Sequence, residues 1–139
     1  MKPLYTAHAT SKGGRDGHVR SSDGIIDLDV KTPKELGGPG GAATNPEQLF
    51  AAGYSACFES ALRLVARMQK RTLPDATTIT ANVTLNATEE RRYVISVELH
   101  GKFGDLSHDE AHALMDAAHQ VCPYSNATRG NIDVKLFVD

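Results

Sequence analysis

The chain has 139 residues, of which 40% are hydrophobic and 23% are charged, and its formal net charge is -2 at pH 7. This length suits one folded domain over residues 1–139, and the composition argues against a disordered or fibrous protein. Phosphate binding requires clustered Lys and Arg, so a chain of nearly balanced charge is not expected to have nucleic acid as its main partner.

The first residues, Met1–Thr6, lack the apolar core of a secretory signal peptide, and no stretch approaches the ~20 apolar residues of a membrane span. We therefore expect a cytoplasmic protein without a membrane partner. In a reducing compartment, cysteines are more often reactive or metal-binding than joined in a permanent structural disulfide. Cys57 and Cys122 are accordingly the first candidates for chemistry.

The first third of the chain is predicted to be extended. Short β-like runs cover residues 4–10 and 18–21, and apolar and polar residues alternate over 26–30 as in a half-buried strand. The glycine-rich segment 36–41 resembles a phosphate-binding loop only superficially, since no Gly-Lys-Ser/Thr follows it. A flexible connection is the favoured interpretation.

A helix is predicted to begin at Asn45, which suits the N-cap, with Pro46 at the first helical position. Glu47 lies in the first turn, and Gln48 can close a capping box. The helix can extend to about residue 71. Small and apolar residues leave almost no polar face before Glu59, so the first half should be buried as the central helix of the fold.

The second half of the chain predicts two strands over 79–85 and 93–99, joined by a polar turn and therefore antiparallel. Ser107 and Glu110 form a second capping box before a helix that Pro123 ends. Alternation over 132–138 is typical of a strand that returns to a sheet. This order of elements predicts an α+β fold.

The two cysteines carry no decisive pattern of their own. Cys57 has small helical neighbours that would let a ligand approach, but a free cysteine is more often buried and inert unless a cation or helix N-terminus lowers its pKa. Cys122 lies at a helix end, where a loop can move toward a partner sulfur. Their spacing is not Cys-x-x-Cys, so a redox pair and two unrelated core thiols both stay open.

Three histidines raise a rival interpretation. His108, His112 and His119 share one stripe of the second helix, with Cys122 near its edge. The ~16 Å rise from the first to the last is too long for one zinc with ligands at ~2.1 Å unless a partner chain helps. A solvated helix face is the simpler explanation. No Gly-x-Ser-x-Gly motif or comparable spacing favours a hydrolase.

Three segments carry a family resemblance: residues 5–17 with Gly13-Gly14-Arg15, the helical run Asn45–Phe58, and Val121–Asn131. Together they resemble the organic hydroperoxide resistance branch of the Ohr/OsmC family. The similarity extends over essentially the whole chain, and the Gly-Gly-Arg turn favours this branch over the osmotically induced one. The resemblance implies an Ohr/OsmC-like fold, with antiparallel sheets around a long buried central helix, and an intertwined homodimer.

The resemblance also implies a thiol-dependent peroxidase that reduces alkyl and fatty-acid hydroperoxides to alcohols. Cys57 would attack the peroxide and become a sulfenic acid, and Cys122 would condense with it to a disulfide. A dihydrolipoyl group on a partner protein would reduce that disulfide, and no metal or other cofactor is needed. Arg15 would stabilise the thiolate, with Glu47 orienting the guanidinium.

An apolar pocket would explain a preference for organic hydroperoxides over hydrogen peroxide, and Phe50, Tyr124 and leucines near the site are candidates for its wall. Glu59 departs from the family pattern, in which an apolar residue is more frequent at that position. Two other functions stay open: a thiol redox sensor or disulfide carrier without peroxidase turnover, and a metal- or ligand-binding module that uses the histidine stripe.

Helix geometry sets a problem for this site. On a straight helix Glu47 and Cys57 are ten residues and about 15 Å apart, too far for one hydrogen-bond network. We hypothesise that each site combines Cys57 and Cys122 of one subunit with Arg15 and Glu47 of the other. The alternative is a break in the helix near Gly53 that returns Glu47 within one chain.

Overall fold

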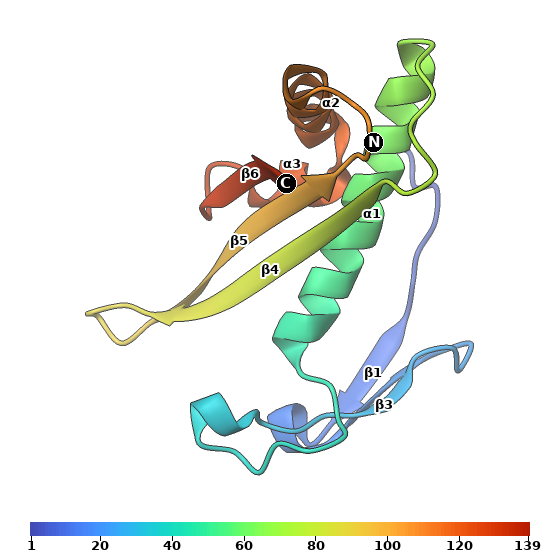
Figure 1. The fold of residues 1–139 in the computed structure, drawn as a ribbon. Coiled ribbons are helices and arrows are strands. Elements are labelled where there is room, and N and C mark those ends of the chain that lie inside the picture. The colour runs from blue at the N-terminus through green and yellow to red at the C-terminus, as the bar shows by residue number, and fades with distance from the viewer. The chain divides into compact units, whose positions relative to one another are not determined.

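The computed structural model describes residues 1–139, and the chain forms two compact units, Met1–Leu49 and Phe50–Asp139. Each unit has its own three-stranded sheet, as Figure 1 shows. The combination of helices and sheets confirms the predicted α+β class. None of the helices combines the length and the hydrophobicity that crossing a bilayer demands.

The first unit is built on a small antiparallel sheet in the order β1-β2-β3. Its strands are β1 (Ala9–Lys12), β2 (His18–Ser21) and β3 (Asp27–Asp29), and two short 3-10 helices, η1 (Gly14–Asp16) and η2 (Lys34–Leu36), lie in the connections. The extended runs predicted over 18–21 and 26–30 are confirmed. The first strand was predicted too early, because pairing with β2 starts only at Ala9, opposite Ser21.

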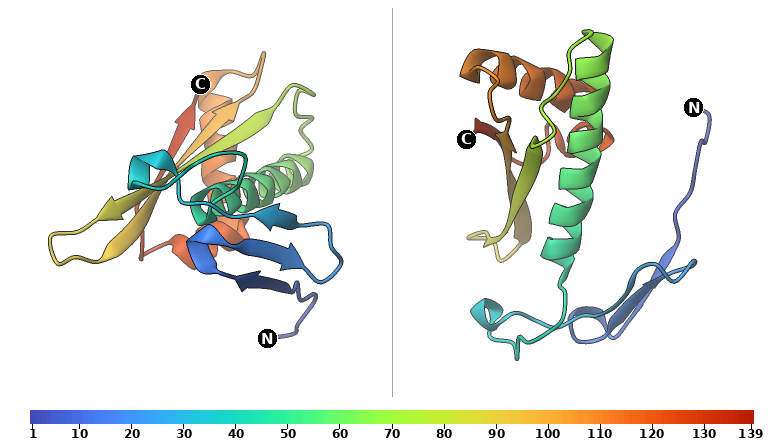
Figure 2. Two further views of the ribbon diagram at one scale, coloured as in Figure 1. Left: turned by 90° about the horizontal axis from the view of Figure 1, so that it is seen from below. Right: turned by 45° about the vertical axis from the view of Figure 1, so that its right-hand side comes forward.

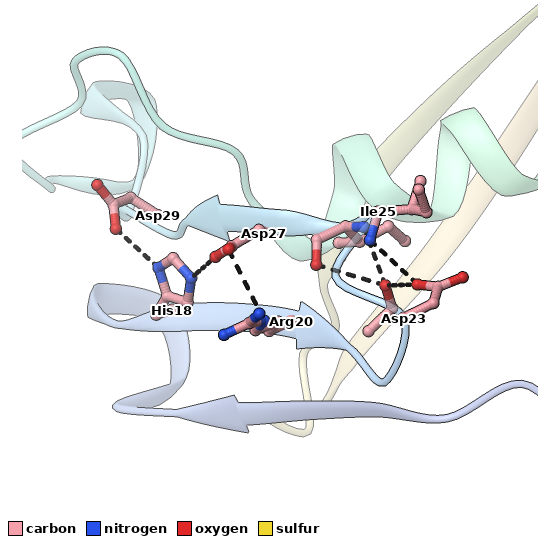
Figure 3. A network of polar contacts seen from close by, with 8 residues as sticks. His18, Arg20, Asp23, Ile25, Asp27 and Asp29 are labelled. Atoms are coloured by element: carbon pink, nitrogen blue, oxygen red, sulfur yellow. Dashed lines mark hydrogen bonds and ion pairs between the residues drawn. The ribbon is translucent and has the colours of Figure 1, made fainter.

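A charged network joins two strands of this sheet (Figure 3). His18 on β2 lies between two carboxylates of β3, with Nδ1 2.9 Å from Asp29 and Nε2 2.5 Å from Asp27. Arg20 Nε is 3.8 Å from the other oxygen of Asp27. The hydrogen bonds to Asp29 and then to Asp27 raise the pKa of His18. A ring that faces a carboxylate at both nitrogens binds best as the imidazolium, which has two N–H donors.

The second unit contains a sheet of β4 (Thr78–Ala87), β5 (Tyr93–Lys102) and β6 (Val134–Val138), in that order. β4 and β5 form the predicted antiparallel pair, with Val83 opposite Val97. The last strand returns to the sheet as predicted but runs parallel to β5, with Val134 beside Val97. The family expectation of antiparallel sheets therefore holds for every pair except this one. Side-chain alternation predicts a strand but not its direction.

The first helix, α1 (Pro46–Met68), begins as predicted, because the backbone N–H of Gln48 donates to Asn45 Oδ1 at 2.8 Å. It continues without interruption past Gly53, so the alternative of a break there is wrong. Its end lies three residues before the predicted position. Lys70 has φ 54°, a left-handed conformation that terminates helices.

In the second unit α1 lies along one face of the sheet (Figure 2), and its buried side chains belong to the core of this unit. Full burial on α1 starts at Tyr54, whereas Ala52 and Ala56 are exposed. The prediction of a buried first half is therefore correct for one stripe only. The buried α1 residues pack with Val97, Leu99 and the later helix over His108–Val121 in one cluster. Its α1 members are Tyr54, Phe58, Ala61, Leu62, Val65 and Ala66.

Two further helices, α2 (His108–Val121) and α3 (Pro123–Thr128), follow the sheet hairpin. Ser107 caps α2 by accepting from the backbone N–H of Glu110, as predicted. Pro123 ends α2 but also starts α3, where its missing N–H is not needed. The mobile loop expected after Cys122 is therefore a helix, and Cys122 lies at the junction of two helices.

We predict that the His18 ring titrates at a higher pH than an ordinary histidine and that Asp29→Asn lowers this pKa. Because the folded pKa is raised, the contribution of His18 to stability is complete below the unfolded value of about 6.5 and is lost as pH rises through the folded value. NMR titration of the imidazole resonances measures the pKa of His18 in wild type and in Asp29→Asn. Asp23→Asn is the matched control, since Asp23 contacts Ser21 and Ile25 instead. Identical titration in wild type and Asp29→Asn would contradict the assignment.

Candidate active site

The two cysteines are neighbours in the second unit. They are 65 positions apart in the sequence, and Cys122 Sγ donates a hydrogen bond to Cys57 Sγ at 3.8 Å. Both are free thiols, Cys122 fully buried and Cys57 half-buried. A disulfide requires about 2.05 Å between sulfurs, so only a small approach separates this arrangement from a covalent bond. The two thiols are therefore in contact, as an intramolecular redox pair requires.

A close contact between α1 and α3 places Cys57. Gly53 lies one turn before the cysteine, and a Cβ at that position would be 2.6 Å from the hydroxyl oxygen of Tyr124. The missing side chain thus leaves room for the tyrosine ring against the helix. The backbone N–H of Tyr124 hydrogen-bonds to Cys57, so α3 contacts the sulfur directly.

The surroundings of Cys57 in this unit do not favour its thiolate. Burial raises the pKa of the thiol, and the hydrogen bond from the N–H of Tyr124 opposes that effect only in part. The neighbouring Cys122 raises the pKa further. Since the thiolate is the nucleophilic form, a reactive Cys57 requires a cation in addition to these contacts.

Arg15 and Glu47 form a bidentate ion pair in the first unit. Arg15 Nη1 donates to Glu47 Oε2 at 2.9 Å, and Nη2 donates to Oε1 at 2.6 Å. The hydrogen bond from Arg15 lowers the pKa of Glu47, and the carboxylate in turn raises that of Arg15. The Glu47 side chain is only 15% exposed, whereas that of Arg15 is 39% exposed. Glu47 therefore holds one edge of the guanidinium in a fixed orientation, and the rest of the group is accessible to solvent or a ligand.

The turn that carries Arg15 is tightly constrained. A Cβ at Gly17 would be 1.8 Å from the carbonyl oxygen of Lys12, so only glycine fits there. The Asp16 carboxylate accepts from the backbone N–H and the hydroxyl of Thr32, at 3.2 and 3.3 Å. Sequence reasoning missed this Asp16 contact, although an aspartate directly after the turn arginine is a common backbone-binding residue.

An aromatic cluster and an apolar cavity involve residues of α1 and α3. The ring centroids of Phe50, Tyr54 and Tyr124 lie 5.5–6.0 Å apart. Beside them is a cavity of about 470 Å³. Of the predicted wall residues, Phe50 and Tyr124 line it, whereas no leucine does. The complete lining is Phe50, Ile95, Pro123, Tyr124, Ala127, Thr128, Asn131 and Ile132.

The histidine stripe does not converge on a common point. His112 contacts Asp116 at 3.2 Å, whereas His119 contacts Ser125 at 2.8 Å. No group of three or more His, Cys, Asp and Glu side chains is arranged to hold a metal ion. The metal-binding alternative thus has no support in these contacts.

Glu59 lies on α1 near the thiol but has its own partner. Its carboxylate accepts from Arg63 Nε, one turn further along the helix, at 2.5 Å. This local ion pair accounts for a charged residue at a position where an apolar one was expected.

The fold and the paired thiols define the class of the protein. The family model described as OsmC-like protein matches residues 38–137, and the chain belongs to this family. The family resemblance stated from the sequence is thus confirmed.

Similar proteins cover nearly the whole chain. The organic hydroperoxide resistance protein of Xanthomonas axonopodis pv. citri is 53% identical over 135 residues, which are 97% of this chain and 94% of that protein. Organic hydroperoxide resistance protein OhrA of Bacillus subtilis is 50% identical over 143 residues, which cover 99% of this chain and 97% of that protein. The crystal structure of an organic hydroperoxide resistance protein from Legionella pneumophila has a TM-score of 0.92 at 56% identity, with 99% of each chain covered.

Proposed function

We propose that the protein is a thiol-dependent peroxidase that reduces alkyl and fatty-acid hydroperoxides to alcohols. The observation that carries this proposal is the pair of free thiols, with half-buried Cys57 at 3.8 Å from buried Cys122. The names of full-length relatives in Xanthomonas and Bacillus support a role in the detoxification of organic hydroperoxides.

In the proposed cycle the Cys57 thiolate attacks the outer oxygen of R–O–O–H. The O–O bond breaks, the sulfur becomes a sulfenic acid, and the alkoxide takes a proton and leaves as the alcohol. The Cys122 thiol then displaces water from the sulfenic acid and forms the Cys57–Cys122 disulfide. A dihydrolipoyl group of a partner protein reduces the disulfide by thiol exchange.

Arg15 supplies the cation that Cys57 needs in this scheme. Two of the five guanidinium N–H donors bind Glu47, and the rest stay available for an anion. Arginine is always charged, so it favours the thiolate and then the oxygen on which charge develops as the O–O bond breaks. Glu47 fixes the direction of this fork and does not touch the substrate.

Each complete site takes its halves from two subunits of a homodimer in our proposal. Glu47 and Cys57 are ten residues apart on the uninterrupted helix α1, a rise of about 15 Å. Arg15 and Glu47 of one subunit therefore act on Cys57 and Cys122 of the other. The two compact units of a chain are parts of one functional domain over residues 1–139.

The apolar cavity accounts for substrate preference. Tyr124 relates the cavity to the attacking sulfur, because its backbone N–H hydrogen-bonds to Cys57 and the same residue lines the cavity. An alkyl group that enters gains about 25 cal/mol for each Å² of apolar surface removed from water. Hydrogen peroxide has no such surface, so it should be the poorer substrate.

We predict that the protein consumes tert-butyl hydroperoxide rapidly with dihydrolipoamide and reacts more slowly with hydrogen peroxide. Cys57→Ser should reduce the rate to background, because serine is not ionised at neutral pH and cannot form a sulfenic acid. Cys122→Ser should still form one sulfenic acid for each Cys57 but lose disulfide-dependent turnover. A coupled peroxidase assay measures these rates. An equally active Cys57→Ser variant would reject the proposal, and cysteine oxidation without turnover would favour a redox sensor or disulfide carrier.

Mixed dimers test the shared site. A heterodimer of Cys57→Ser and Arg15→Met subunits keeps one intact site if Arg15 acts across the interface, so we predict about half of wild-type activity from the two-fold symmetry. Purification through two different affinity tags isolates this species. A heterodimer of Cys57→Ser with wild type is the control, because it keeps one site in either arrangement. Activity as low as that of the parent homodimers would show that Arg15 acts within its own chain.

A further inference from the structure

A continuous chain of hydrogen bonds runs through the second unit beside the two sulfurs. His119 Nδ1 lies 2.8 Å from Ser125 Oγ, which lies 2.9 Å from the hydroxyl of Tyr54. That hydroxyl lies 3.1 Å from Thr128 Oγ1, and the threonine hydroxyl reaches the carbonyl of Tyr124 at 3.0 Å. Tyr54 and Ser125 are fully buried.

Each hydroxyl group has one proton to donate, and this fixes which group donates and which accepts at every hydrogen bond of the series. A backbone carbonyl only accepts, so Thr128 must donate to it, Tyr54 must donate to Thr128, and Ser125 must donate to Tyr54. The remaining link then requires a proton on Nδ1 of His119. Burial lowers the pKa of His119, which favours the neutral ring with its one N–H on Nδ1. Every link is satisfied in this single arrangement.

Two residues of this hydrogen-bond chain lie on either side of the resolving cysteine in the sequence. His119 lies three residues before Cys122 on α2, and Ser125 lies three residues after it on α3. Their mutual hydrogen bond therefore closes the helix junction around the sulfur. Tyr54 ties this junction to α1 one turn before Cys57. Hydrogen bonds are directional, so they restrain this junction more narrowly than apolar packing alone.

The last link ends on the residue that contacts the attacking sulfur. Thr128 donates to the carbonyl of Tyr124, and the N–H of the same residue hydrogen-bonds to Cys57. Cys57 thus contacts this polar network through Tyr124, whereas Cys122 is joined to it only through the backbone between His119 and Ser125. None of the network's side chains is a reacting group.

We propose that Tyr54, Ser125 and His119 are positioning residues that hold Cys122 in line for closure of the disulfide with Cys57. The step is Cys57–S–OH plus HS–Cys122 giving Cys57–S–S–Cys122 and water, and it rests on the proposed peroxidase cycle. A second hydroperoxide competes for the sulfenic acid and oxidises it to sulfinic acid, with release of another alcohol. Fast closure therefore protects Cys57 from inactivation.

Tyr54→Phe and Ser125→Ala each remove one hydroxyl, and with it two of these hydrogen bonds, and keep the shape of the side chain nearly intact. In both variants we expect unchanged oxidation of Cys57 by tert-butyl hydroperoxide, closure slowed by about tenfold, and a larger sulfinic acid fraction. Rapid quenching followed by dimedone labelling and mass spectrometry separates the sulfenic acid, the disulfide and the sulfinic acid. Ser60→Ala is the control, because Ser60 is exposed on the same helix and its hydroxyl contacts only the carbonyl of Ala56.

A second measurement needs no hydroperoxide. Equilibration with reduced and oxidised glutathione gives the effective concentration of the Cys122 thiol toward Cys57, which should fall by about tenfold in both variants and stay unchanged in Ser60→Ala. If wild type does not react with hydroperoxides, the peroxidase proposal fails, while this equilibrium still decides the positioning role. Closure rate and effective concentration equal to wild type in both folded variants would overturn the inference. Two variants of different chemistry guard against a loss of fold in either.

Discussion

Burial of Cys57 is the constraint on which the rest of this account depends. Packing against α3 places the sulfur beside Cys122, but the same burial raises the pKa of the thiol. Position and reactivity therefore conflict within the second unit. A permanently charged group is the direct physical remedy, because it favours the thiolate without exposing it to water.

The first unit is organised around such a group. Val30 is the only buried residue among the first 49, so polar contacts take much of the role of a core there. His18 joins β2 to β3 through two carboxylates, and Asp16 ties the arginine turn to Thr32. The bidentate pair with Glu47 then sets the direction of Arg15. The contacts of Asp16 and Glu47 thus both restrain the placement of one guanidinium.

Local patterns in the sequence predicted most of the elements. The caps at Asn45 and Ser107 are contacts between residues a few positions apart, so each helix start was predictable from its own residues. The parallel direction of β6 and the helix after Cys122 were not, because both depend on how distant segments pack. The Gly53 to Tyr124 approach is a similar case, since nothing near either residue in the sequence specifies the other.

The contacts of the candidate site, like those between distant segments of the fold, were not predictable from local sequence patterns. Arg15, Glu47, Cys57 and Cys122 came from a family resemblance and not from periodicity, and their pairwise contacts are visible only in the folded units. His119 was grouped with a metal-like stripe because a helical wheel shows which residues share a face and not what they contact. Its partner Ser125 belongs to another helix.

The pKa of Cys57 is the most direct test of this account. In a Cys122→Ser background, where only one thiol titrates, the ultraviolet absorbance of the thiolate reports that pKa as a function of pH. We expect a Cys57 pKa well below the ordinary ~8.5 with Arg15 present and a value above it in Arg15→Met. Arg20→Met is the control, because Arg20 belongs to the same unit but lies on β2 near Asp27. A Cys57 pKa that is the same with and without Arg15 would contradict the claim that this arginine activates the thiol.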